Sequence, residues 1–350
     1  MNAGEKILNV SAAVAVRVNV QRLVLSLADH WGLKRNGEER PSFPFIRRRR
    51  NPSFQILRYH RVNDEKDPFL YGTPTKMFGV QMETLSRHFH VLPLEELMDR
   101  VALEDVPPRA VAITFDDGYR DNYVNAFPVL KALGLPASIF LATGGVGAKT
   151  PLWHDRVFNA LRQTIREKMT IEDTGYSLRT VSEKCAALWA LREHLRKYAS
   201  SLERDSRIQR ILSELNVSGE DDDGSEILCW AEIEEMARHR ISFGAHTVTH
   251  PILTSIPLAE AEEEIRLSKE TIEQKLNVPV RLFAYPNGSR RDFNEPIKSA
   301  LRDAGFLCAV TILWGTNDSG TDPFELRRMG IWDPDPNVAL LKLGWHKFAS

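Results

Sequence analysis

Short apolar runs alternate with helix-like patterns from residue 54 onward, and this alternation constrains the fold more than any other feature. The runs at 110–115 and 137–141 are apolar almost throughout, which is typical of parallel strands buried on both faces. Strand-like runs are predicted at 54–59, 110–115, 137–141, 241–245, 280–284 and 306–311. Repeated β-then-α units imply parallel strands joined by right-handed crossovers, so the expected fold class is α/β.

Helical patterns lie between these runs and carry their own boundary signals. Thr75 is expected to cap the first helix. The segment 122–133 is predicted to be helical, with an interruption at Pro128 and an end at Gly134. Further helices are predicted at 94–101, 231–240, 258–276 and 295–304.

Residues 151–229 break this alternation. They are rich in Arg, Glu and Leu, show helical periodicity and contain no strong strand pattern, so we predict a helical insertion. The acidic stretch 220–223 within it lies between two glycines and is expected to be an exposed loop. The chain is thus divided into an N-terminal extension, residues 1–53, and a β/α domain, residues 54–350, that carries the insertion.

The N-terminal extension contains an apolar-rich stretch, residues 7–33, that Arg17 and Arg22 interrupt. No run there reaches the roughly 18 apolar residues that a membrane span requires. Positive charges within the stretch, rather than before it, do not fit a secretory signal. Apolar spacing in steps of three and four predicts an amphipathic helix, followed by a basic linker at Arg47–Arg50. We interpret the helix as a docking element, with a membrane-surface anchor facing anionic lipid as the alternative.

Charge and cysteine content narrow the class of protein. Forty-six Lys and Arg nearly balance forty-seven Asp and Glu, for a formal net charge of -1, which excludes a strongly basic nucleic-acid binder. The three cysteines are far apart and form no CxxC pair, so no disulfide framework is expected. These features favour a cytoplasmic protein without a nucleic-acid partner, with peripheral membrane contact as the alternative.

The first chemical motif, TFDDGY at 114–119, begins where the apolar run 110–115 ends. Two adjacent carboxylates, Asp116 and Asp117, are costly at a strand end unless a cation or hydrogen bonds compensate them. Neighbouring side chains of an extended chain point in opposite directions, so one can bind a metal while the other faces a water molecule. A turn with side-chain-to-backbone hydrogen bonds is the structural alternative.

The second motif, HTVTH at 246–250, follows the predicted strand 241–245. His246 and His250 can bind one ion if the backbone between them turns helically, and an exposed structural pair is the alternative. With Asp117 they supply three nitrogen or oxygen ligands and leave a position for water, as in catalytic zinc sites. We therefore expect one divalent metal ion, with Zn²⁺ as the first candidate and Asp116 as the acceptor of the water's proton.

A third motif, FAYPNG at 283–288, again comes at a predicted strand end. Its Pro-Asn-Gly turn exposes backbone N–H groups that could hold an oxyanion. These three motifs, in this order, resemble those of the polysaccharide deacetylase family, carbohydrate esterase family 4, with its NodB-homology domain. The resemblance covers roughly residues 54–333, and LRYHRV at 57–62 is also similar. It implies a distorted (β/α) barrel with fewer than eight strands, and metal-dependent hydrolysis of N- or O-acetyl groups on sugars.

The resemblance also implies roles for individual residues. Asp116 would be the catalytic base, and the backbone amide of Asn287 would share the oxyanion with the metal. The implied metal ligands are Asp117, His246 and His250. The expected sugar contacts are aromatic residues in or beside the motifs: Tyr119, Tyr285 and Trp153.

The sequence departs from the family pattern in two places. Many members have an arginine that orients the base where this chain has Ala284. Arg328, before a predicted final strand, is the candidate substitute, and a surface salt bridge is its alternative role. Many members also carry a late histidine as the general acid, whose nearest match here is His346, one residue out of register.

Other histidines compete for the role of the acid. His60, at the end of the first strand, is a candidate acid, or a residue that packs and hydrogen-bonds beneath the metal site. His154, beside Asp155, could line the sugar cleft or form part of a helix start. The sequence leaves the acid unassigned.

The expected function is metal-dependent deacetylation of a saccharide, a polysaccharide or a lipid-linked sugar. Without an export signal, a cytoplasmic sugar precursor or a lipid-linked saccharide fits better than an extracellular polymer. A carbohydrate-binding barrel that keeps the metal but has lost the chemistry is the alternative. A phosphoesterase would usually need a second ligand cluster, which the sequence does not supply.

Overall fold

The structure, a computed structural model, describes residues 53–330 except 66, 70–71, 149–150, 197–199 and 218–225. The chain divides into two compact units, Met1–Arg50 and Asn51–Ser350, and the described residues all belong to the second. The predicted N-terminal helix, the basic linker, the acidic loop and His346 lie outside the described residues. No helix in the described part of the chain is long and apolar enough to cross a membrane.

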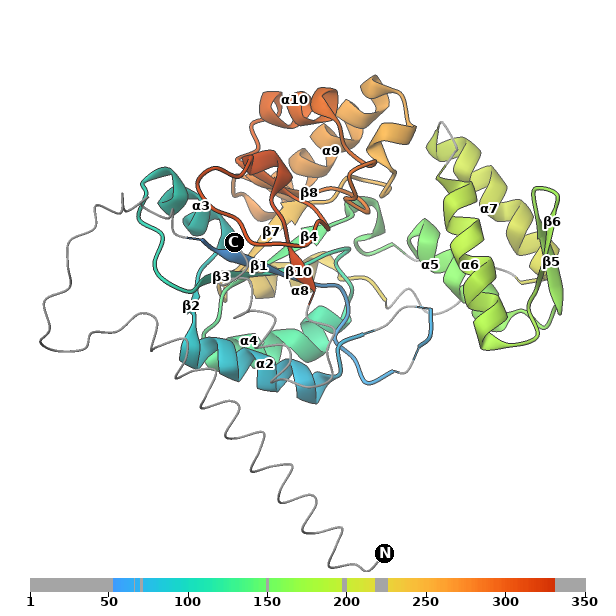
Figure 1. The fold of residues 1–350 in the computed structure, drawn as a ribbon, viewed down its shortest axis with the longest axis horizontal. Coiled ribbons are helices and arrows are strands. Elements are labelled where there is room, and N and C mark those ends of the chain that lie inside the picture. Colours follow the sequence, from blue (N-terminus) through green and yellow to red (C-terminus); the bar gives the residue numbers. More distant parts are fainter. Residues whose placement is uncertain are drawn as a thin grey trace, which may run out of the picture. The chain divides into compact units, whose positions relative to one another are not determined.

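An eight-stranded sheet forms the centre of the described fold (Figure 1). Its strands are β1 (Gln55–Tyr59), β2 (His90–Val91), β3 (Ala110–Phe115), β4 (Ala137–Leu141), β7 (Ile241–Ala245), β8 (Leu282–Ala284), β9 (Cys308–Val310) and β10 (Met329–Gly330). They follow the order β10-β1-β3-β4-β7-β8-β9, with β2 beside β3, and each described pairing is parallel. The predicted α/β class is confirmed, and the loops after these strands share one edge of the sheet.

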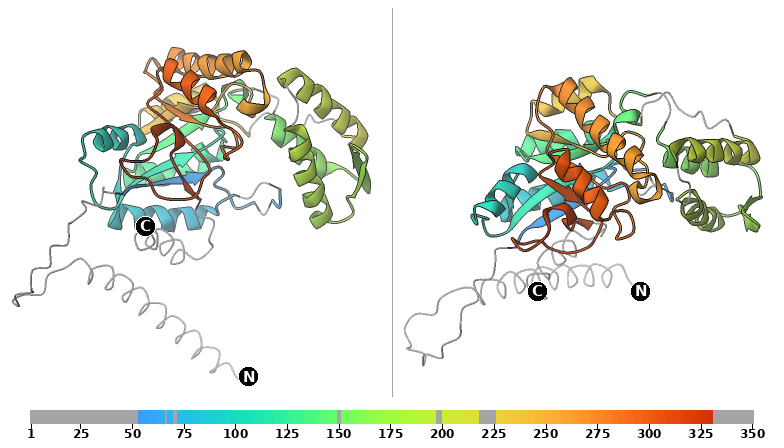
Figure 2. Two further views of the ribbon diagram at one scale, coloured as in Figure 1. Left: turned by 45° about the horizontal axis from the view of Figure 1, so that its top comes forward. Right: turned by 90° about the horizontal axis from the view of Figure 1, so that it is seen from above.

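Helices follow the strands and cover the outside of the curled sheet. They are α2 (Thr75–His88), α3 (Leu94–Ala102), α4 (Phe127–Leu133), α8 (Trp230–Ala237), α9 (Leu258–Leu276) and α10 (Glu295–Asp303). Figures 1 and 2 show α2 and α4 on one side of the sheet and α9 and α10 on the other. All six residues of β3 and all five of β4 are buried, as their apolar sequences predict.

Two helix boundaries differ from the sequence prediction. Thr75 does not cap α2, because Pro74 holds the cap position and the Asp64 side chain accepts the hydrogen bond from the Thr75 N–H at 3.0 Å. Pro128 does not interrupt a helix either. It lies in the first turn of α4, where no N–H donor is needed, after a π-helical turn at Asn122–Ala126. Gly134 ends α4 with a φ of 64°, as predicted.

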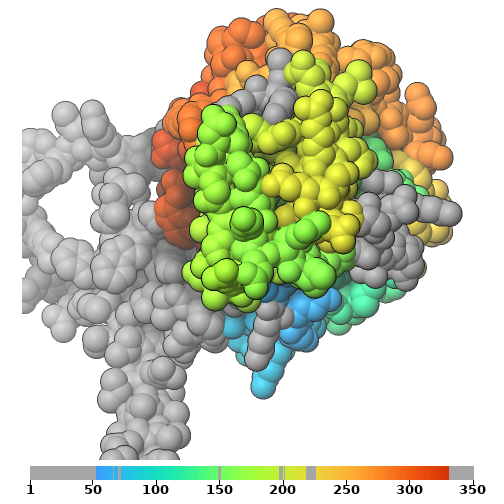
Figure 3. All heavy atoms as spheres, turned by 90° about the vertical axis from the view of Figure 1, so that its right-hand side faces the viewer, coloured from blue at the N-terminus to red at the C-terminus, as the bar shows by residue number. Residues whose placement is uncertain are grey.

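The insertion has its own apolar core and contains both helices and strands. It contains α5 (Trp153–Gln163), β5 (Lys168–Ile171), β6 (Thr174–Ser177), α6 (Val181–Leu195) and α7 (Ser201–Leu215). The expectation of a purely helical segment is wrong, because β5 and β6 form an antiparallel hairpin. Figure 3 faces this region, with the hairpin and α6 in green beside α7 in yellow. Side chains from every element except β6 are fully buried together in a separate cluster.

Candidate active site

Asp116 directly follows β3 and is held by Arg328. The Arg328 guanidinium donates one hydrogen bond to each carboxylate oxygen of Asp116, both at 2.7 Å. Arg328 also donates to the Thr311 carbonyl at 2.8 Å and lies 3.2 Å from the Thr114 hydroxyl. Burial favours protonation of Asp116, but the charge and hydrogen bonds of Arg328 hold its pKa at about 2. Arg328 is therefore no surface residue; it fixes an ionised carboxylate in place.

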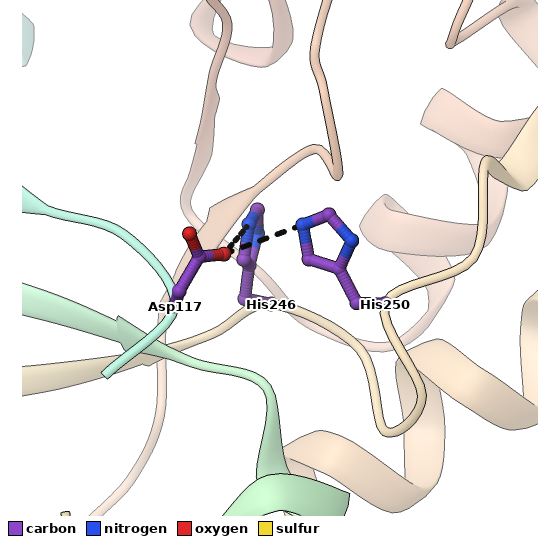
Figure 4. Close-up of side chains that lie close together, drawn as sticks. All are labelled: Asp117, His246 and His250. Carbon is purple, nitrogen blue, oxygen red and sulfur yellow. Dashed lines mark ion pairs between the residues drawn. The ribbon is translucent and has the colours of Figure 1, made fainter. Parts of the chain in front are cut away.

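Asp117 points toward His246 and His250 in the loop after β7, as Figure 4 shows. Its backbone φ is 71° and that of Gly118 is 78°, so the chain turns sharply after β3. Asp117 Oδ1 lies 3.3 Å from Nε2 of His246 and 3.3 Å from Nε2 of His250. Burial opposes ionisation of Asp117, but the neighbouring histidines hold its pKa well below the usual value. Three ligand atoms thus converge from two strand ends.

The backbone between the two histidines is a loop, which corrects the expectation of a helical turn. Thr247 and His250 have φ values of 68° and 56°, and no helix includes them. Glu264 of α9 stabilises this loop by accepting backbone hydrogen bonds from Val248 at 2.7 Å and Thr249 at 2.9 Å. Sequence reasoning missed Glu264, since nothing distinguishes it from the other glutamates of a helix far along the chain.

The three residues fit a divalent metal ion. Among the described residues, Asp117 Oδ1 is buried without a hydrogen-bond partner, and the three ligand atoms lie within 4.8 Å of one another. His246 Nδ1 lies 2.7 Å from the Ala284 carbonyl, so this nitrogen carries the proton and leaves Nε2 as a donor of a lone pair. Burial lowers the pKa of His250, which favours the neutral imidazole that metals bind, whereas Asp117 and Asp116 outweigh burial and raise the pKa of His246.

His60 lies on the other side of Asp116. Its Nε2 is 3.8 Å from Asp116 Oδ2, and 28% of its side chain is exposed. Burial lowers the pKa of His60, although the charges of Asp116 and Asp117 partly offset this effect. Both predicted roles of His60 stay predictions: a proton donor to the leaving group, or a residue that packs and hydrogen-bonds beneath the metal site.

The residue pair at the start of α5 lies beneath the predicted metal ligands rather than in an open cleft. The rings of His154 and His250 are 4.8 Å apart, and both His154 and Asp155 are buried. The Tyr119 hydroxyl donates to Asp155 Oδ1 at 2.9 Å and lies 3.2 Å from His154 Nε2. Burial raises the pKa of Asp155 and lowers that of His154, so both favour their neutral forms.

The aromatic residues expected to contact sugar are buried, so these three predictions are corrected. Tyr119 has 0% of its surface exposed and Tyr285 has 1%. The ring of Tyr285 stacks on Phe293. Trp153 is 7% exposed, and its indole N–H donates to the His250 carbonyl at 2.9 Å. Trp153 therefore supports a predicted metal ligand from behind.

Asn287 lies at the same edge of the sheet, after β8. This strand pairs with β7 through Ala245 and Phe283, so the segments carrying His246 and Asn287 leave neighbouring strands. Asn287 has a φ of 58° and Gly288 a φ of 69°, which gives a tight turn. The Gly288 carbonyl accepts a hydrogen bond from Ile312 at 3.0 Å, which fixes this turn against the segment after β9.

Comparison with known proteins explains this arrangement. The family model described as polysaccharide deacetylase matches residues 104–309, which include both aspartates, both histidines and Asn287. The chain belongs to the polysaccharide deacetylase family. It is accordingly a hydrolase that acts on carbon–nitrogen bonds other than peptide bonds, as the resemblance of the motifs implied.

Sequence relatives carry names of the same family. Over 289 residues, covering 82% of this chain and 74% of the relative, the sequence is 21% identical to YxkH of Bacillus subtilis (strain 168), which carries a polysaccharide deacetylase name. Over 107 residues it is 36% identical to a poly-beta-1,6-N-acetyl-D-glucosamine N-deacetylase of Staphylococcus epidermidis, covering 26% of this chain and 37% of that protein.

Two solved structures share the curled parallel sheet. The deacetylase PplD of Streptococcus pyogenes, in complex with acetate, superposes with a TM-score of 0.57 at 18% identity, covering 84% of this chain and 99% of that chain. IcaB of Ammonifex degensii gives 0.55 at 21% identity, with 83% and 97% covered. The predicted distorted barrel of the NodB type is confirmed.

Proposed function

We propose that this protein is a metal-dependent deacetylase that hydrolyses the N-acetyl group of a saccharide. The observation that carries the proposal is the convergence of Asp117, His246 and His250 beside a second carboxylate, Asp116, that Arg328 holds ionised. A site with three ligands and a separate base is suited to hydrolysis by an activated water molecule.

The roles of the residues follow from their positions. A divalent ion held by the three ligands, zinc being the first candidate, would supply a positive charge that acidifies water and polarises the acetyl carbonyl. Asp116 accepts the proton of the attacking water, and Arg328 keeps its carboxylate oriented. The backbone N–H of Asn287 donates to the oxygen that becomes negative as the tetrahedral intermediate forms. Arg328, directly before β10, thus takes the orienting role that an arginine has in many relatives at the position of Ala284.

The substrate we propose is a polymer or oligomer of N-acetylglucosamine. The similarity to the Staphylococcus epidermidis enzyme, which is named for poly-beta-1,6-N-acetyl-D-glucosamine, supports this class. A lipid-linked saccharide is the second candidate. With that substrate, we propose that the protein is cytoplasmic and contacts the membrane peripherally through its N-terminal segment.

Acetate release tests the proposal. The full-length, zinc-loaded protein is incubated with β-1,6- and β-1,4-linked N-acetylglucosamine pentamers and with an N-acetylated glycolipid. We expect acetate from at least one of them, and a rate lower by about 10²–10⁴ in Asp116→Asn, the contribution of a general base. Asp303→Asn, at an exposed position on α10, is the matched control and should keep the rate. No acetate from any of the three substrates would contradict the proposal.

A further inference from the structure

One face of α6 in the insertion contacts the barrel at both ends of the helix. Cys185, Trp189, Arg192 and Arg196 are separated by four, three and four residues, so their side chains lie along the same side of the helix. A different side packs into the insertion's own core through Leu188, Leu191 and Leu195. The four-residue face is therefore not used to hold the insertion together.

The two ends of this face contact loops at the catalytic edge of the sheet. Cys185 Sγ lies 3.9 Å from the carbonyl of Pro68, in the segment that follows β1. Arg196 donates a hydrogen bond to the carboxylate of Asp292, which is fully buried in the segment that follows β8. Since both segments leave the carboxyl ends of parallel strands, α6 extends along the edge that carries the predicted metal ligands.

Trp189 and Arg192 lie between these two anchor points. The Arg192 guanidinium is 5.2 Å from the centre of the Trp189 ring, yet 65% of Trp189 remains exposed. Partial burial lowers the pKa of Arg192, and the charge of Asp117 acts on this pKa in the opposite direction. A large aromatic side chain thus remains mostly exposed next to the catalytic edge, on a helix that contacts this edge on either side of Trp189.

We propose that Trp189 and Arg192 form a sugar subsite that binds a neighbouring unit of the saccharide whose acetyl group is hydrolysed. The inference rests on the proposed function. The apolar face of a pyranose ring stacks on the uncovered indole, while Arg192 steadies the indole and donates hydrogen bonds to hydroxyl or amide oxygens. The charge of Arg192 suits a neutral or anionic unit and repels the ammonium group of an already deacetylated unit.

Binding is tested in full-length, zinc-loaded Asp116→Asn protein, which lacks the base and leaves the ligand intact. Isothermal titration calorimetry measures the affinity for a β-1,6-linked N-acetylglucosamine pentamer and for the glucosamine pentamer. We expect Trp189→Ala to weaken binding of the acetylated pentamer at least about ten-fold, since burial of an indole face exceeds the 1.4 kcal/mol that ten-fold represents. The parent protein should bind the acetylated pentamer more tightly than the glucosamine pentamer, and Arg192→Gln should reduce the ratio of these two affinities.

Leu202→Ala is the matched control, because Leu202 is 83% exposed on α7 of the same insertion. It should bind both pentamers as the parent protein does. In the active protein, Trp189→Ala should raise KM for the pentamer with little change in kcat, because the subsite does not touch the reacting atoms. Equal affinity in Trp189→Ala and Leu202→Ala, or no binding of the pentamer by the parent protein, would overturn the subsite. Binding without acetate release would instead contradict the proposed function alone.

Discussion

Replacing Arg328 with methionine removes both hydrogen bonds that orient Asp116. The two side chains are at most 3% exposed, and each of the two N–H···O contacts measures 2.7 Å. Removing one partner of a buried ion pair costs roughly 3–5 kcal/mol, because the remaining charge stays buried without compensation. We expect Arg328→Met to lower the free energy of unfolding near neutral pH by about this amount.

The same substitution changes the dependence on pH. In the native protein burial raises the pKa of Asp116, but Arg328 holds it at about 2, below the ordinary 3.8. A lowered pKa in the folded state means that the stability from Asp116 is present above about pH 4 and is lost as the pH falls toward 2. The difference of roughly two pKa units corresponds to about 2–3 kcal/mol. Without Arg328, the opposition to burial is weaker, so the pKa of Asp116 should rise.

Two assays on purified full-length protein follow both effects. Urea unfolding gives the free energy, and the pH profile of kcat/KM for acetate release reports the protonation of the base. The acid limb of that profile should move to higher pH in Arg328→Met. Arg327→Met, at the exposed neighbouring position, is the matched control and should change neither measurement. An unfolding free energy within about 0.5 kcal/mol of the parent, the range of neutral surface substitutions, would refute the reasoning.

Two further predictions concern the support of the predicted metal ligands. Trp153→Phe keeps the ring packing but removes the N–H that donates to the His250 carbonyl, so zinc affinity should fall about 10-fold or more, as a competition titration with a chelator would measure. Unchanged affinity would argue against this role. Glu264→Gln weakens the acceptor of two backbone hydrogen bonds from Val248 and Thr249, and should lower the unfolding free energy by about 1.5–3 kcal/mol in urea titrations. If Glu264→Gln lowered the unfolding free energy by less than the same substitution of an exposed glutamate on α9, this role of Glu264 would be contradicted.

The strands and the candidate ligands were predictable because they depend on local patterns. Strands β3, β4 and β7 begin and end where the apolar runs do, since strands buried on both faces are continuously apolar. The meeting of Asp117 with His246 and His250 followed from the rule that parallel strands end at one edge.

Features that depend on contacts between distant segments could not be read from local pattern. Trp153 and Tyr119 were expected to touch sugar, but the insertion and the loop after β7 bury them. The hairpin β5–β6 was missed because of the residues in its two-residue loop, Glu172-Asp173. Glu172 has a φ of 54°, a conformation for which such turns usually have Asn or Gly, so the sequence lacks the usual hairpin pattern. The role of Arg328 needed the pairing of β10 with β1.

Metal content tests the central claim most directly. Plasma mass spectrometry is applied to the full-length protein, to His250→Ala and to His239→Ala, all prepared without chelator and offered zinc. Because His239 is exposed after α8, its variant is the control for a lost histidine. The account predicts about one divalent ion per chain in the parent and in His239→Ala, and a clear loss in His250→Ala. No ion in the parent protein, or equal ion content in all three proteins, would contradict it.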